Sequence, residues 1–229
     1  MKKILFETHH LYYLPNFLPI INSLKSRGGY KIFMSMPQYM QDRERNLFYN
    51  AANDIGLELI KTDLEEDRID NIKSKNFDVI IVGNVGQLSK IVSKSTIAVM
   101  VYHGIGLKQS YYNDIDSRID IRAVESESRY ETLTDQGHQN LALTGYTKLD
   151  PLFSINEEET IVTKKTLGID NHLPTLLYAP TFYPTSFDNL ASELEYLSSE
   201  FNIIIKLHNF SWFQQRFIYQ SKLAQEIES

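Results

Sequence analysis

The chain has 229 residues, of which 42% are hydrophobic and 23% are charged, and its formal net charge is −6. These values are typical of a globular protein with one large or two small domains, and they argue against a fibrous or disordered chain. The sequence has no cysteine, which excludes disulfides, thiolate metal sites and a cysteine nucleophile. The acidic balance predicts no nucleic-acid partner, because phosphate binding needs a basic face.

No apolar run approaches the ~20 residues that a membrane-spanning helix needs. The longest runs are Val79–Val82 and Ile97–Tyr102. The two lysines near the start are followed by only a short apolar run before Glu7, which is not the pattern of a signal peptide. These features predict a cytoplasmic protein and leave peripheral attachment to a membrane surface open.

The first 150 residues alternate short apolar runs with amphipathic stretches, which is the pattern of successive strands and helices. Strands are predicted at Lys3–Thr8, Tyr30–Met36, Leu57–Lys61, Phe77–Gly83, Thr96–Tyr102, Ile121–Val124 and Asn140–Leu143. Helices are predicted at Pro15–Ser26, Asp42–Ile55, Glu65–Ser74, Gly86–Ser93 and Ser126–Gln136. Strands that are apolar throughout indicate a parallel sheet covered on both faces, so residues 1–150 are predicted to form one Rossmann-like α/β domain.

The chain changes character at residues 151–159, where a proline, an asparagine and three successive glutamates indicate a linker. Beyond it, helices are predicted at Thr160–Leu167, Leu190–Ser199 and Asn209–Ser229, and strands at Thr175–Ala179 and Phe201–Leu207. Two strands are fewer than the ~4–6 of an ordinary sheet. Residues 151–229 are therefore predicted to hold a linker and an incomplete second α/β domain, whose open strand edges favour a homo-oligomer or a partner.

Each candidate site follows the carboxyl end of a predicted strand, where open α/β sheets bind ligands. His103 and Gly104 follow the strand Thr96–Tyr102. A histidine can act as a general base near neutral pH, and replacing it by alanine is expected to abolish activity with little effect on folding. Gly104 permits close approach of the backbone to a ligand, and Lys108 adds a positive charge suited to phosphate. The alternative is a loop with a solvent-facing histidine.

Two later loops carry polar groups of the same kind. Thr181 follows Pro180, which ends a predicted strand, and it offers a hydroxyl and a backbone N–H. Lys206 and His208 alternate onto one side of the last strand and suit a phosphate or diphosphate. The alternatives are a plain turn at Thr181 and a histidine that packs against Phe210.

The first strand is followed by two histidines, His9 and His10, of which at most one is expected to face the ligand-binding edge. No carboxylate or histidine stands at ligand spacing from them, so no metal site is predicted. No G-x-G-x-x-G pattern follows this strand, which argues against a nicotinamide dinucleotide, and no other cofactor is predicted.

Three segments of the sequence resemble motifs of a known protein family. Tyr102–Lys108 reads Y-H-G-I-G-L-K, Tyr178–Phe182 reads Y-A-P-T-F, and Lys206–His208 reads K-L-H. In order and spacing they resemble the motifs W-H-G-T-P-L-K, Y-A-P-T-W and K-x-H-P of the CDP-glycerol glycerophosphotransferase family, which includes teichoic-acid polymerases and primases. Glu125–Glu127 and Thr144–Leu152 resemble the S-E and T-G-x-P-R-x-D-x-L segments of that family.

The resemblance implies a GT-B architecture, in which two Rossmann-like domains enclose the active site. It implies transfer of glycerol phosphate, or a related polyol phosphate, from a CDP-activated donor to an acceptor hydroxyl in surface-polysaccharide assembly. His103 would be the base, and His208 and the loop with Thr181 would bind the phosphates of the donor. The acceptor would be lipid-linked or a saccharide, at the inner face of the plasma membrane.

The sequence departs from the family pattern at several positions. Ile105 and Gly106 replace Thr and Pro, Tyr183 replaces an Arg, and Asn209 replaces a Pro. The D-x-S-S segment that follows in the family is not found after His208. Two alternatives therefore stay open: a shortened, non-catalytic or partner-dependent remnant of the same fold, and a GT-B glycosyltransferase or epimerase that uses a nucleotide sugar.

Overall fold

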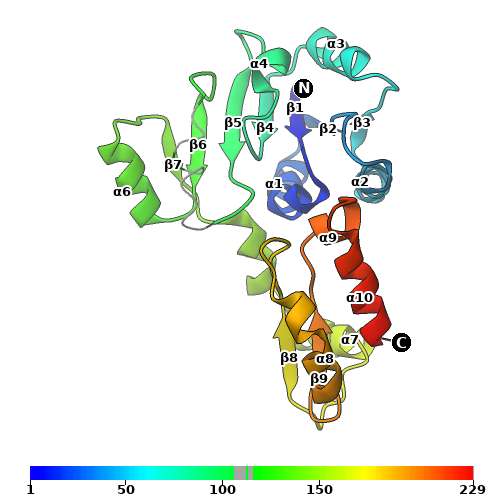
Figure 1. Cartoon of the computed structure of the whole chain (residues 1–229). Helices are drawn as coiled ribbons and strands as arrows, with labels where there is room; N and C mark the ends of the chain where they lie inside the picture. The colour runs from blue at the N-terminus through cyan, green and yellow to red at the C-terminus, as the bar shows by residue number, and fades with distance from the viewer. Residues whose placement is uncertain (106–111, 113–115, 229) are drawn as a thin grey trace. The chain divides into compact units, whose positions relative to one another are not determined.

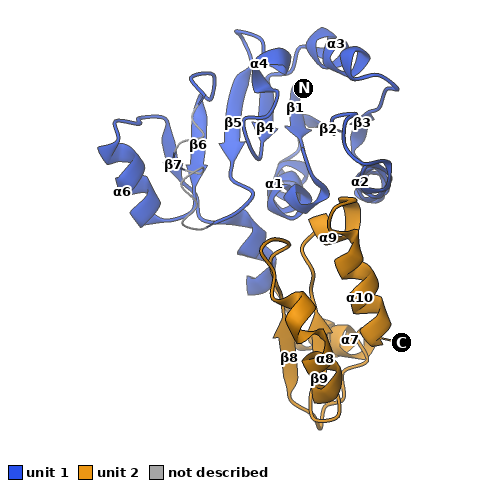
Figure 2. Ribbon diagram, in the orientation of Figure 1, with its two compact units in different colours: residues 1–153 blue, residues 154–229 orange. Residues whose placement is uncertain are grey.

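The computed structural model describes residues 1–105, 112 and 116–228. The chain divides into two compact units, residues 1–153 and residues 154–229, which Figure 2 shows in blue and orange. The first unit is a seven-stranded sheet with helices packed on it, and the second is a smaller α/β unit with a two-stranded sheet (Figure 1).

The sheet of the first unit has the strand order β3-β2-β1-β4-β5-β6-β7, and every neighbouring pair is parallel. Its strands are β1 (Lys2–Glu7), β2 (Tyr30–Ser35), β3 (Glu58–Ile60), β4 (Val79–Val82), β5 (Ile97–Val101), β6 (Ile121–Val124) and β7 (Leu141–Leu143). Each of these strands overlaps a strand predicted from the sequence. The prediction of a parallel α/β sheet is confirmed.

Helices cover both faces of the sheet, which explains why its central strands are apolar at successive positions. In β1, Phe6 packs in one core with Phe17 of α1 and Phe48 of α2, whereas Leu5 packs in a second core with Ile72 of α3. The helical segments of this unit are α1 (Leu14–Arg27), α2 (Asp42–Asp54), α3 (Glu65–Lys75), α4 (Leu88–Ile91), α6 (Glu127–Asp135) and the 3-10 turns η1 (Leu11–Tyr13) and η2 (Thr147–Phe153). Because successive side chains of a strand point to opposite faces of the sheet, each strand contributes to the cores on both faces.

The direction of chain progress across the sheet reverses between β1 and β4. From β1 the chain proceeds outward through β2 and β3, and from β4 it proceeds the other way through β5, β6 and β7. The carboxyl ends of β1 and β4 are therefore the topological switch point, where ligands bind in open α/β sheets.

The second unit is built around the parallel pair β8 (Thr175–Tyr178) and β9 (Asn202–Ile205). Its buried core contains Phe187 and Leu194 of α8, with Leu207 after β9 and Leu223 of α10 packed against them. The helices of this unit are α7 (Glu157–Thr166), α8 (Phe187–Leu197), α9 (Phe210–Phe213) and α10 (Ile218–Glu228). Helices thus pack against the apolar residues on one face of the β8–β9 pair.

The start of this unit corrects one prediction. Residues 157–159, predicted as part of a linker, form the first turn of α7. The Asn156 side chain accepts a hydrogen bond from the backbone N–H of Glu159 at 2.8 Å, and the Glu159 carboxylate accepts one from the Asn156 N–H at 3.2 Å. Because carboxylates are stabilised at a helix N-terminus, the run of glutamates is a helix start.

The end of the unit corrects a second prediction. The single helix predicted over residues 209–229 is divided into α9 and α10, because the backbone is extended at Gln214. The break lets Phe217 turn inward, where it is 7% exposed and packs on Phe182 with ring centroids 5.0 Å apart. The break in the helix thus coincides with the burial of an aromatic ring, which is favourable.

The helices are short compared with a bilayer. The longer ones, α1 and α2, have 14 and 13 residues, whereas a spanning helix needs ~20 apolar residues. In the described part of the chain, none combines the length and the apolar character that crossing a membrane requires.

Candidate functional site

His103 follows β5 at the carboxyl edge of the first sheet. Its Nδ1 lies 2.8 Å from the carbonyl oxygen of Gly83, the residue that follows β4. A carbonyl oxygen only accepts hydrogen bonds, so Nδ1 must carry a hydrogen and act as the donor of this hydrogen bond. In the neutral imidazole, Nε2 then holds the lone pair that a general base needs.

Aromatic rings hold the His103 side chain in one orientation. Its ring stacks on Tyr13 with centroids 4.4 Å apart and an interplanar angle of 17°, and it meets Tyr12 edge-on at 5.6 Å. Gly83 makes the stack possible, because a Cβ atom at that position would lie 2.6 Å from the Tyr13 ring. The imidazole is therefore pre-positioned, which proton transfer requires.

The backbone of His103 is fixed from a second direction. Its carbonyl oxygen accepts hydrogen bonds from the Tyr146 hydroxyl at 3.1 Å and from Asn16 Nδ2 at 3.4 Å. The Thr147 hydroxyl donates to the Asn16 carbonyl at 2.7 Å. Tyr146 and Thr147 belong to the T-G-Y-T segment, so this segment supports the loop that carries the histidine.

The neighbouring sequence motifs differ in what they contribute. Gly104 is half-buried at this edge, whereas Lys108 lies outside the described residues.

Ser126 caps α6 by accepting a hydrogen bond from the Arg129 N–H at 3.3 Å. Glu125 forms an ion pair with the Arg129 side chain at 3.0 Å. Glu125 and Ser126 thus anchor α6 to the end of β6.

His9 occupies the switch point. It follows β1, is 5% exposed, and its Nδ1 lies 2.9 Å from the Tyr39 hydroxyl. Burial, followed by the nearby charges of His10 and Arg68, lowers the pKa of His9 to about 4. His9 is therefore a neutral imidazole at physiological pH, able to form hydrogen bonds without adding charge.

Gly86, in the loop after β4, is required by the position of His9. Its φ is +47°, and an alanine Cβ atom there would lie 2.1 Å from Cε1 of the His9 ring. We expect Gly86→Ala to cost about 1–2 kcal/mol for the left-handed backbone and about 1–3 kcal/mol more for the overlap. Gly137→Ala is the matched control, since its φ is +89° with no described atom within 4 Å of the Cβ position. Equal midpoints of urea unfolding for the two variants would contradict the close contact.

A buried ion pair lies under the same edge. Glu7, the last residue of β1, and Arg68 of α3 are both fully buried, with Nη1 and Oε1 2.8 Å apart. Arg68 also donates to the Ser35 hydroxyl at 2.6 Å and pairs with Glu65 at 2.6 Å. Burial raises the pKa of Glu7 to about 7, although the charge of Arg68 opposes the rise. The pair ties the ends of β1 and β2 to α3.

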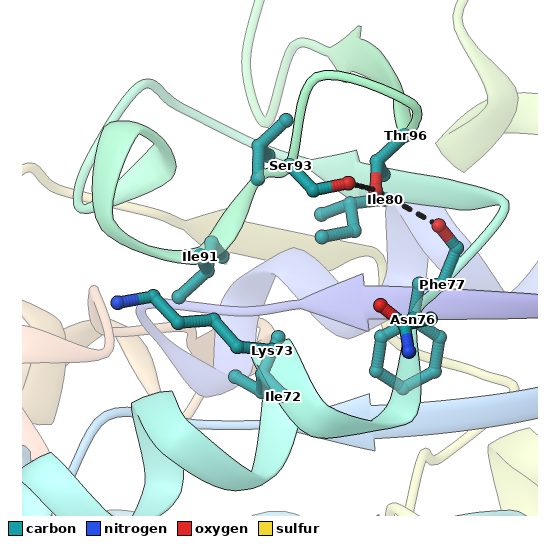
Figure 3. Close-up of a pocket in the computed structure, with 9 residues that line it drawn as sticks. Ile72, Lys73, Asn76, Phe77, Ile80, Ile91, Ser93 and Thr96 are labelled. Carbon is teal, nitrogen blue, oxygen red and sulfur yellow. Dashed lines mark hydrogen bonds between the residues drawn. The ribbon is translucent and has the colours of Figure 1, made fainter.

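A pocket of about 170 Å³ lies at the other end of the sheet, next to the residues that precede β4 and β5. Figure 3 shows its apolar wall, which includes Ile72 and Ile80. At its rim the Thr96 hydroxyl donates to the Phe77 carbonyl at 2.9 Å. None of the site residues predicted from the sequence lines this pocket, and it is remote from the ends of the strands where ligands are expected.

In the second unit, Thr181, Lys206 and His208 gather at the carboxyl edge of the β8–β9 pair. Tyr178 of β8 pairs with Ile205 of β9, and the Lys206 N–H extends the ladder by donating to the Tyr178 carbonyl at 2.9 Å. Thr181 and Lys206 are exposed, and His208 is half-buried. The loops after the two strands therefore meet at one edge.

His208 combines packing with a directed polar group. Its ring contacts Phe182 at 4.7 Å and Phe210 at 4.9 Å between centroids. Its Nδ1 accepts a hydrogen bond from the Phe210 N–H at 3.1 Å, so the proton of the neutral ring is on Nε2. His208 can therefore donate a hydrogen bond to an anion through Nε2.

The predicted site residues thus form two groups. The first unit brings His103 and Gly104 to the edge shared with His9 and Tyr13, and the second unit collects Thr181, Lys206 and His208. That the two groups face one crevice stays a prediction. In the part of the chain that the structure describes, no group of three or more histidines and carboxylates is placed to hold a metal ion.

Two residues that hold His103 in place, Tyr13 and Tyr146, were not predicted from the sequence. Tyr13 had a signal, because two tyrosines follow the histidines at the end of the first strand. Tyr146 lies in the segment Thr144–Leu152 that resembles a family motif, but nothing in the sequence connects it with His103, 43 positions away.

No protein-family model and no curated protein matches this chain. Several solved structures do. The UDP complex of MnaA from S. aureus aligns with a TM-score of 0.63 and 11% identity, over 99% of this chain and 66% of that one. UDP-GlcNAc 2-epimerase from Neisseria meningitidis, bound to UDP-GlcNAc, aligns with a TM-score of 0.54 and 15% identity, over 98% of this chain and 68% of that one.

A glycosyltransferase from Rickettsia africae aligns with a TM-score of 0.51 and 11% identity, over 99% of this chain and 66% of that one. The chain thus spans about two thirds of the length of these structures. At such low identity the likeness concerns the fold alone. It confirms the predicted fold class: the protein has a GT-B-like α/β fold with a Rossmann-like parallel sheet.

Proposed function

We propose that the protein transfers glycerol phosphate, or a related polyol phosphate, from a CDP-activated donor to an acceptor hydroxyl in cell-surface polysaccharide assembly. The observation that carries the proposal is the environment of His103. Its Nδ1 donates to Gly83, its ring is stacked on Tyr13, and Nε2 is the basic nitrogen at the ligand-binding edge. The resemblance of three loop motifs to glycerophosphotransferases supports CDP-glycerol as the donor.

In this reaction the acceptor oxygen attacks the phosphorus that carries the glycerol, and the bond from that phosphorus to the CMP oxygen breaks. The Nε2 atom of His103 takes the proton of the hydroxyl as the new bond forms. Negative charge grows on the departing CMP, and Lys206 and the Nε2–H group of His208 would stabilise it. No covalent intermediate with the protein is needed.

The acceptor on this proposal is a lipid-linked or saccharide hydroxyl, so the protein would work at the inner face of the plasma membrane. Association into a homo-oligomer is part of the same proposal. The strand β8 supports this association, because its described partner in the sheet is β9 alone, which leaves its other edge unpaired. Leu177 in this strand is 63% exposed and could be buried by a second copy.

A second candidate function is that of a GT-B glycosyltransferase or epimerase acting on a nucleotide sugar. The similar structures from S. aureus and N. meningitidis contain UDP and UDP-GlcNAc, which favours a uridine nucleotide. The two candidates differ in the donor that each would bind, so donor affinity separates them.

Isothermal titration calorimetry of the full chain with CDP-glycerol and UDP-GlcNAc, and with CDP and UDP as references, tests the proposal. We expect CDP-glycerol to bind at least about tenfold more tightly than UDP-GlcNAc, which corresponds to about 1.4 kcal/mol. The reverse order would establish the second candidate. Absence of heat with all four ligands would favour a non-catalytic remnant of the fold.

A further inference from the structure

Arg216 lies in the turn between α9 and α10 of the second unit, and its side chain is exposed. Its guanidinium carbon is 5.3 Å from the ring centroid of Tyr183 and 5.3 Å from that of Phe217. Both distances are within the range of cation–π contacts. The arginine is therefore exposed to solvent and also in contact with an aromatic surface.

This aromatic surface continues to the two loops that follow β8 and β9. Phe182, in the loop after β8, contacts Phe217 at 5.0 Å and His208 at 4.7 Å between ring centroids. The side chain of Gln220 in α10 donates to the Phe182 carbonyl at 2.9 Å, which fixes that loop against the helix. Arg216 thus belongs to the same edge of the second unit as His208.

The charge at this edge is unusual for an acidic chain. From residue 201 to residue 217, just before α10, the sequence has two cationic residues, Lys206 and Arg216, and no carboxylate. The loop after β8 and its flanks, residues 173–187, have no charged residue at all. Among the described residues, Arg216 forms neither an ion pair nor a hydrogen bond. Asp188, the residue after the stretch 173–187, accepts a hydrogen bond from the Tyr219 hydroxyl of α10 at 3.2 Å. The loops that follow β8 and β9 themselves carry no carboxylate, so their charge is positive.

We propose that Arg216 binds the diphosphate of the nucleotide donor, together with Lys206 and the Nε2–H group of His208. The ligand class rests on the proposed function, but the argument for an anion site does not. A guanidinium in contact with aromatic rings keeps N–H groups available, and these match two phosphate oxygens at once. The aromatic contacts also restrict the side chain before binding, which lowers the entropy cost of holding the ligand.

Calorimetry of the full chain with inorganic pyrophosphate, CDP and UDP tests this assignment. Arg216→Ala is expected to weaken binding of all three about tenfold, because one charge-assisted contact is lost. Lys222→Ala is the matched control, since it removes the same charge from an exposed position of the adjoining helix. Arg216→Lys is expected to weaken binding as well, because an ammonium lacks the planar fork. Cytidine, which has no phosphate, should show no difference between the variants.

The outcomes separate the two proposals. Unchanged affinity of Arg216→Ala, or an equal loss in Lys222→Ala, would overturn the role of Arg216 and leave the proposed function in place. Pyrophosphate binding that depends on Arg216, without binding of CDP-glycerol, would keep the anion site and remove the proposed function. Failure of the unaltered chain to bind any of the phosphates would overturn both. Thermal unfolding of each variant verifies that the exposed substitutions leave the fold intact.

Discussion

Replacing His103 by asparagine is expected to slow transfer by about 10²–10⁴-fold, the usual contribution of a general base. The amide nitrogen of asparagine occupies the place of the imidazole Nδ1 and can still donate to the Gly83 carbonyl, 2.8 Å away in the unaltered protein. Asparagine has no basic atom in place of Nε2. Release of CMP from CDP-glycerol, with a lipid-linked disaccharide as acceptor, measures the effect.

Asparagine is preferred to alanine because of what the structure shows around the ring. We expect His103→Ala to lower stability as well as activity, since the imidazole stacks on Tyr13 at 4.4 Å and donates to a buried carbonyl. Alanine would leave that carbonyl without its donor, at a cost of about 1–3 kcal/mol. Asparagine loses only the stack, about 1 kcal/mol.

His172→Asn is the control for the loss of a histidine, because His172 is exposed in a turn of the second unit. We expect it to retain full activity. Full activity of His103→Asn, with donor binding intact, would show that another group removes the proton. Loss of donor binding in His103→Asn would instead assign His103 to ligand binding.

Replacing Arg68 by methionine is expected to lower the free energy of unfolding by about 3–5 kcal/mol at pH 8, because it leaves the buried carboxylate of Glu7 without its partner. Both side chains of this pair are fully buried, so solvent does not screen their charges. The loss is expected to be clearly smaller at pH 5. Urea unfolding of the two proteins at both pH values measures the difference.

The pH dependence follows from the direction of the Glu7 shift. Burial raises the pKa of Glu7 from 4.5 to about 7, so the folded state binds a proton more tightly than the unfolded state. The stability that Glu7 contributes is complete below pH 4.5 and is lost as the pH rises through 7. Without Arg68, which opposes the rise, the pKa of Glu7 moves further upward. The variant therefore loses stability relative to the unaltered chain as the pH rises, whereas at pH 5 Glu7 is neutral in both.

Two controls isolate this effect. Arg43→Met removes an exposed arginine from the neighbouring helix α2 and is expected to change stability little. Glu7→Gln in the Arg68→Met background removes the carboxylate and should remove the difference between pH 5 and pH 8. An equal loss at both pH values in Arg68→Met alone would show that a group other than Glu7 responds to the arginine.

The central strands of the first unit could be predicted because successive residues in them are apolar, a property visible within a few residues. Phe6 and Leu5 point into different cores, and only a strand covered on both sides requires two successive apolar residues of this kind. Element ends were harder to predict. The glutamates at residues 157–159 resemble a linker in composition, and the capping contacts of Asn156 with Glu159 show that they begin a helix.

The candidate site could be located from the sequence but not described. His103 and His208 were identified because each follows a predicted strand, and strand ends of a parallel sheet carry the ligand-binding loops. Their proton positions could not be predicted. The proton of His103 is placed on Nδ1 by Gly83, 20 positions away, whereas that of His208 is placed on Nε2 by the nearby N–H of Phe210. Arg216 has no recognisable motif, and its aromatic contacts identify it.

By itself, the sequence determined that this protein is a parallel α/β chain with histidines at the ends of its strands, because hydrophobic periodicity is a local property of the chain. Only the tertiary structure decided which nitrogen of His103 is basic, that Glu7 is buried against Arg68 from 61 positions away, and that Arg216 contacts the Tyr183 ring. These features depend on contacts between segments far apart in the chain. The geometry of such contacts arises when the sheet and its helices pack together.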